Sequence, residues 1–321
     1  MKNILRSKAV RWAFVAATLV GGGYEIARRW HEITHALGQL SPLAIAGALV
    51  CVLAAQVGTL RTWQVLLAGL GSPLPATAAA RVLFIGQLGK YLPGSVWPVL
   101  AQMELGTIHQ VPRHRSASAS VLTMLASLLT GLLAAAVTLP LTGHADSYLW
   151  AYTAVPVLLV CLYPRVLRWG MNRLLRLARQ PALDRPLSGP VLVQALAWSL
   201  SAWVCNGLQI YLLVPVHSGT ALLLSIGGYA FAWCVGFLVV FAPGGFGVRE
   251  VLLVTTLTPL AGTGTATAVA LVSRVLTTVS DLLSAAVGAS FHRKPGLPER
   301  VNTERTNVRE EAEEKSDAAR H

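Results

Sequence analysis

The sequence predicts an all-α, polytopic integral membrane protein. We expect a helical bundle of about seven to eight spans, two segments of which are broken or re-entrant. Hydrophobic residues make up 54% of the 321-residue chain and charged residues only 12%, about half the charged share of a soluble domain. Apolar runs of bilayer-spanning length recur along the chain, and two segments rich in Pro, Gly and charge interrupt them.

The spans are read from apolar runs of about 20 residues. The candidates are 12–27, 42–60, 118–140, 190–214, 220–241 and 266–290, with a shorter one at 148–163. Residues 80–108 are too interrupted for a simple span and are expected to dip into the bilayer and return. Residues 243–262 form a broken span.

Basic residues orient these elements, because Lys- and Arg-rich loops stay on the cytoplasmic side. The basic positions are 2–11, Arg61, Arg113, Arg115, the cluster from Arg165 to Arg185, Arg293 and Lys294. This pattern predicts a multi-pass protein of the plasma membrane with both termini in the cytoplasm. Residues 1–291 would form the transmembrane domain, and the charged tail 292–321 is expected to be disordered.

The net charge of +12 belongs to the membrane domain, because the tail holds seven Lys/Arg and seven Asp/Glu. Nucleic-acid binding needs a basic soluble face, which the sequence does not offer. The basic excess instead favours anionic lipid as a partner.

Ionised residues at predicted membrane depth mark the candidate site, since charges in hydrocarbon are costly and usually functional. The bases are Arg81, Lys90, Arg249 and Arg274, and the acids are Glu104, Glu250 and Asp281. The surplus positive charge predicts a phosphate-bearing guest held by Lys90, Arg249 and Arg274. The acids would position those bases or pair with a cationic headgroup. Mutual pairing, with one group reaching water, is the alternative.

The two broken segments strengthen this prediction. Pro and Gly create half-helix ends, and a half-helix N-terminus attracts anions. Broken segments in corresponding halves of a chain indicate a central transport site.

Polar residues on 266–290 also fall on one helix face. They are Ser273, Arg274, Thr277, Ser280, Asp281 and Ser284. Arg274 and Asp281 are two turns apart, so each is expected to find its partners elsewhere in the bundle.

The broken segments resemble a known family. Gly-Lys-Tyr-Leu-Pro-Gly-Ser-Val-Trp (89–97) and Ala-Pro-Gly-Gly-Phe-Gly-Val-Arg-Glu (242–250) are similar to the two signatures of the lysylphosphatidylglycerol synthase transmembrane family. This is the membrane half of the multiple peptide resistance factor, and stand-alone relatives include hopanoid-transport proteins.

The resemblance implies a flippase-like lipid translocase that moves modified lipids between leaflets through a cavity lined by re-entrant helices. It assigns Lys90, Tyr91, Pro93, Gly94 and Trp97 to the first re-entrant segment. It assigns Pro243, Gly244, Gly245, Gly247, Arg249 and Glu250 to the second. The expected cargo is an anionic or aminoacylated phospholipid or an isoprenoid-type lipid. A homo-oligomer or a separate synthase is a possible partner.

Catalysis is not expected, because no soluble aminoacyl-transfer domain follows the last span and no donor or cofactor site is visible. The alternatives are a glycosyl- or acyl-transferase acting on a lipid carrier, with Glu250 or Asp281 as base, and an accessory protein without cargo. His31-Glu32-Ile33-Thr34-His35 matches a zinc-protease pattern, but it lies in an expected outer loop without a plausible third ligand. We therefore expect no metal.

Overall fold

The computed structural model describes residues 40–91, 96–142, 187–238 and 247–291, with isolated positions between 156 and 173. The predicted span 12–27, most of 148–163 and the tail 292–321 lie outside these residues. Residues 1–289 form one compact unit, and of the second unit, Ser290–His321, only Ser290 and Phe291 are described. Within the described residues every regular element is a helix, which confirms the all-α prediction.

Five described helices are long and apolar enough to cross a bilayer. They are α3 (Pro42–Gly69), α6 (Arg113–Thr138), α9 (Gly189–Leu213), α10 (Gly219–Leu238) and α11 (Val248–Ser290). These helices confirm the predicted spans 42–60, 118–140, 190–214, 220–241 and 266–290. The chain is therefore a multi-pass membrane protein.

The helix α3 continues well beyond the predicted end at residue 60. Arg61 does not stop it, because its side chain is exposed and donates a 3.0 Å hydrogen bond to Gln64 Oε1 on the same helix face. The helix ends at Gly69, and Gly71 follows with φ 84°, a left-handed conformation that glycine adopts without strain.

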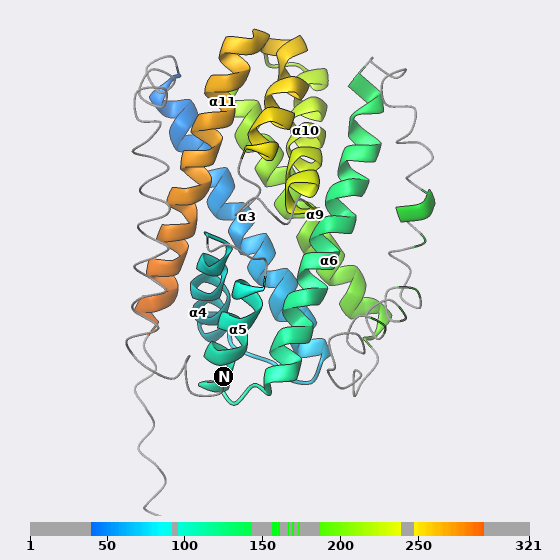
Figure 1. Ribbon diagram of the computed structural model, residues 1–321, viewed down its shortest axis with the longest axis vertical. Coiled ribbons are helices and arrows are strands. Elements are labelled where there is room, and N and C mark those ends of the chain that lie inside the picture. The colour runs from blue at the N-terminus through cyan, green and yellow to red at the C-terminus, as the bar shows by residue number, and fades with distance from the viewer. Residues whose placement is uncertain are drawn as a thin grey trace, which may run out of the picture. The chain divides into compact units, whose positions relative to one another are not determined.

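Residues 76–107 form a helical pair that does not cross the bilayer. It consists of α4 (Ala76–Gln87), the 3₁₀ turn η2 (Leu88–Tyr91) and α5 (Trp97–Thr107). Helices of 12 and 11 residues span about 18 Å and 17 Å, well short of a hydrocarbon core of about 30 Å. Contacts between Gly86 and Gln102 and between Gly89 and Pro98 show that α5 runs back alongside α4, which fits the dip-and-return path predicted for 80–108. Figure 1 shows this pair in the lower part of the bundle.

The helix α11 reverses direction at Gly262, where φ is 75°. A straight helix would place Glu250 and Arg274 about 36 Å apart. Their side chains lie 3.7 Å apart, so the two parts of α11 fold back on each other. The first part also packs against α10, where Gly228 leaves room for Thr256. This second pair, formed by α10 and the first part of α11, lies in the upper part of the bundle (Figure 1).

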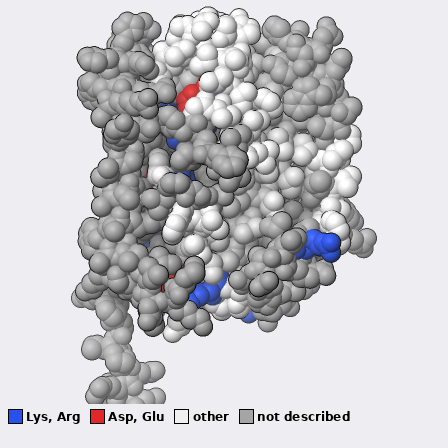
Figure 2. Space-filling view, viewed as in Figure 1, with Lys and Arg blue, Asp and Glu red and all other residues white. Residues whose placement is uncertain are grey.

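Each pair has an apolar cluster of its own. Trp63, Leu66 and Leu83 belong to a cluster around the first pair. Ile210 and Leu257 belong to a cluster around the second pair. Figure 2 shows that the described atoms on one face are mostly uncharged, as expected for a surface in contact with lipid. Residues from both clusters line the cavity described next, together with several polar side chains.

Candidate functional site

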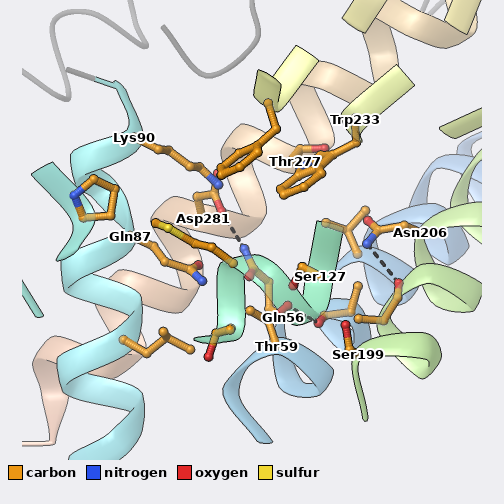
Figure 3. Close-up of a pocket in the computed structure, with 18 of the residues that line it drawn as sticks. Gln56, Thr59, Gln87, Lys90, Ser127, Ser199, Asn206, Trp233, Thr277 and Asp281 are labelled. Carbon is orange, nitrogen blue, oxygen red and sulfur yellow. Dashed lines mark hydrogen bonds and ion pairs between the residues drawn. The ribbon is translucent and has the colours of Figure 1, made fainter. Parts of the chain in front are cut away.

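A cavity of about 260 Å³ lies between the two helical pairs. The helices α3, α4, α5, α6, α9, α10 and α11 and the turn η2 all contribute side chains to its wall. Trp63 and Leu83 come from the first apolar cluster, and Val52, Trp203 and Tyr229 come from the second. Figure 3 shows part of this wall, with side chains from different helices pointing into a common space. The volume is close to the lower end for small-molecule sites, which suits a headgroup rather than a whole lipid.

Asp281 links three separate parts of the bundle. Its Oδ2 lies 2.6 Å from Lys90 Nζ and accepts a 2.6 Å hydrogen bond from the Tyr91 hydroxyl. Its Oδ1 accepts a 2.5 Å hydrogen bond from Gln56 Nε2, which is drawn as a dashed line in Figure 3. The Asp281 side chain is only 2% exposed, whereas that of Lys90 is 36% exposed. The prediction that Asp281 finds its partners elsewhere in the bundle is confirmed.

Glu250 organises the start of α11. Its Oε2 accepts a 2.7 Å hydrogen bond from the backbone N–H of Gly247, the residue just before the helix. A carboxylate that caps its own helix in this way also complements the positive end of the helix dipole. The other oxygen, Oε1, lies 3.7 Å from Arg274 Nε. Arg274 thus also finds a partner outside its own helix segment, as predicted.

Arg249 lies next to this cap but has a different environment. Its side chain is 7% exposed, and its guanidinium carbon lies 4.4 Å from the centroid of the Tyr229 ring. Among the described residues no carboxylate pairs with it. The described wall of the cavity contains three bases, Lys90, Arg249 and Arg274, and one acid, Asp281. Lys90 pairs with Asp281 and Arg274 pairs with Glu250, so Arg249 is the base of this wall without a carboxylate partner among the described residues.

An aromatic wall continues from Tyr229 along the cavity. Trp203 meets Tyr229 and Trp233 edge to face, with centroid separations of 6.4 Å and 5.2 Å. Trp233 stacks on Phe237 at 5.1 Å and nearly parallel. The indole N–H of Trp203 donates to the Ser127 carbonyl oxygen at 3.1 Å, so the ring is held in place. The helices α9 and α10 thus present a rigid, largely apolar face to the cavity.

The other predicted site residues are divided between the protein surface and undescribed segments. Glu104 lies 2.8 Å from Arg113 and outside the cavity wall. Trp97 is 38% exposed, and its neighbour Pro98 lines the cavity instead. Pro93, Gly94, Pro243, Gly244 and Gly245 lie outside the described residues, as does the His31–His35 motif.

The predicted polar face of 266–290 divides in the same way. Arg274, Thr277 and Asp281 line the cavity, and Thr278 joins them. Ser273, Ser280 and Ser284 are buried outside its wall.

Several cavity residues were not predicted from the sequence. Gln56 is one of them, although a lone amide in an apolar helix is itself a polar signal. On α9, Ser199 and Asn206 line the cavity. Gln87, Ser127 and Tyr229 were also missed.

The lysylphosphatidylglycerol synthase TM region family matches residues 11–285. The matched range includes both helical pairs and every residue that lines the cavity. The chain belongs to this family. No curated protein matches it. Membership indicates a function related to membrane lipids, and the family's TM region is not the domain that transfers the aminoacyl group.

Proposed function

We propose that this protein binds the phosphate of an anionic lipid headgroup in the cavity and carries the lipid between leaflets. The observation that supports this most directly is Arg249, a buried base that faces the cavity and has no carboxylate partner among the described residues. A buried cation without a counter-ion is costly, so an anionic guest would complete the site. The phosphate would accept hydrogen bonds from the guanidinium in bidentate geometry.

Lys90 is the second base proposed to contact the phosphate. It is the more exposed partner of Asp281, and Tyr91 and Gln56 would continue to satisfy that carboxylate if Lys90 moved toward a guest. Arg274, held by Glu250, would contribute a nearby positive field.

The helical pairs explain how a polar headgroup would cross. The helices of the first pair are short, and the cavity lies between the two pairs, so polar side chains replace hydrocarbon along part of the path. This reduces the cost of removing the headgroup from water. The acyl chains would remain in lipid.

Leaflet exchange of labelled lipid in proteoliposomes tests the proposal. We expect the protein to accelerate exchange of fluorescent phosphatidylglycerol, and Arg249→Gln to slow it at least about tenfold, as expected for loss of a charge-assisted contact. Arg61→Gln is the matched control, because Arg61 is exposed and lies outside the cavity wall. The same assay with an aminoacylated lipid and with an isoprenoid phosphate tests two alternative cargoes. Absence of acceleration for every anionic or aminoacylated lipid would overturn the proposal.

A further inference from the structure

We propose that the side of the cavity formed by α6 and α9 is a second subsite, which takes a neutral, hydroxyl-rich group such as a sugar or cyclic polyol. This inference rests on the proposed function, because the group would be esterified to the phosphate held at Arg249. It narrows the cargo to anionic lipids whose headgroup carries several hydroxyls and no amine.

Neutral side chains with an open hydrogen-bond donor or acceptor line this part of the cavity. Asn206 Nδ2 donates to the Ala202 carbonyl oxygen at 2.9 Å, which leaves Oδ1 as an acceptor. The Ser127 hydroxyl on α6 also lines the cavity and hydrogen-bonds to no described residue. Figure 3 shows Ser127 and Asn206 on the opposite side of Gln56 from Lys90. Together these groups offer both donors and acceptors to a hydroxylated guest.

The aromatic wall supplies the second requirement of such a guest. A sugar or cyclic polyol has an apolar C–H face as well as hydroxyls, and that face packs on aromatic rings. Trp203, Trp233 and Phe237 line the cavity next to Tyr229. Aromatic rings opposite a few neutral polar groups are the usual lining of a site for an uncharged polar molecule.

The wall also connects the two subsites. Arg249 lies on one end of it, over Tyr229, and Trp203 is the next ring along. A phosphate at Arg249 would therefore place a directly attached ring beside the indoles. A cavity of about 260 Å³ has room for such a headgroup without its acyl chains.

The charges exclude an amine from this subsite. Asp281 is the one acid in the described wall, and Lys90, Tyr91 and Gln56 already occupy its oxygens. An ammonium group on the α6–α9 side would meet neutral groups only and would lie near a surplus of positive charge. Desolvation of that cation would not be compensated.

Two lipids of equal charge test the subsite. Phosphatidylinositol carries a cyclic polyol, and phosphatidylethanol carries an ethyl group on the same singly charged phosphate. We expect the purified protein to bind phosphatidylinositol about tenfold more tightly in a titration monitored by native mass spectrometry, because about two additional hydrogen bonds form. Ser127→Ala combined with Asn206→Leu should reduce that ratio to about one and leave phosphatidylethanol binding unchanged.

The outcomes separate this inference from the proposed function. Equal binding of the two lipids, or an unchanged ratio in the double variant, overturns the subsite alone. If neither lipid binds, the phosphate site fails as well. Tighter binding of phosphatidylethanolamine than of phosphatidylinositol also overturns the subsite. Trp233→Leu provides an independent variant if the double variant does not fold, and it should reduce the ratio in the same direction.

Discussion

Lys90 in the turn of the first helical pair and Asp281 on the last helix lie 2.6 Å apart, and the acid is far more buried than the base. This asymmetry predicts unequal effects of removing either partner. Asp281→Asn should destabilise the protein by about 2–4 kcal/mol, because Lys90 loses its counter-ion and the interactions with Tyr91 and Gln56 weaken. Lys90→Met should cost less, because Tyr91 and Gln56 still satisfy the carboxylate. The midpoints of thermal unfolding in detergent show which of the two variants is less stable.

The double variant Lys90→Met with Asp281→Leu separates stability from transport. Replacing both partners of a buried pair with apolar groups is often close to neutral, so stability should recover relative to Asp281→Asn. Leaflet exchange should not recover, because Lys90 is proposed to contact the phosphate. Recovery of both would show that the pair is purely structural.

Tyr229 is predicted to hold Arg249 through its ring rather than its hydroxyl, because the guanidinium lies over the ring centroid. Tyr229→Phe should therefore keep lipid binding within about twofold of the wild type. Tyr229→Leu removes an interaction of about 1 kcal/mol and should weaken binding about fivefold. Titration of phosphatidylglycerol onto each variant measures both. Equal losses in the two variants would argue against the stacking role.

Glu250 has two tasks that different substitutions separate. Glu250→Gln keeps an oxygen that can accept from the Gly247 N–H but removes the charge beside Arg274. Glu250→Ala removes both and should be less stable than Glu250→Gln by about 1 kcal/mol, the value of a helix cap. The midpoints of thermal unfolding test this order. Similar midpoints for the two variants would exclude the cap as a source of stability.

The sequence predicted the elements of this fold well but not the partners of its charges. Apolar runs are local, so the spans and the two broken segments could be read directly. The need of Arg274 and Asp281 for distant partners also followed from their spacing on one helix. Which residues become the partners of Arg274 and Asp281 depends on how the two helical pairs pack in the bundle. Glu250 reaches Arg274 only because α11 reverses at Gly262. Glu104 instead forms an ion pair with Arg113 at the start of α6.

The uncharged polar residues on the α6–α9 side of the cavity were not predicted from the sequence, for a related reason. Serines and amides on apolar helices occur both in helix packing and in cavities, and periodicity does not distinguish the two uses. On α9, Ser199 and Asn206 line the cavity, whereas Gln194, Ser201 and Gln209 do not. The series of ring contacts from Tyr229, which lies under Arg249, through Trp203 to Trp233 also follows only from the tertiary fold.

Gly89 is predicted to be the position at which the first helical pair tolerates no side chain. A Cβ there would lie 2.7 Å from the Pro98 nitrogen and 2.8 Å from the Trp97 carbonyl carbon. Both are backbone atoms, so α5 would have to shift, and we expect Gly89→Ala to destabilise the protein by about 1–3 kcal/mol. Gly264→Ala is the matched control, because its Cβ meets nothing within 4 Å and the helix should gain up to about 1 kcal/mol. Because Lys90 follows Gly89 directly, the shift should also weaken binding of phosphatidylglycerol. Wild-type stability and binding in Gly89→Ala would show that the pair is not packed as described.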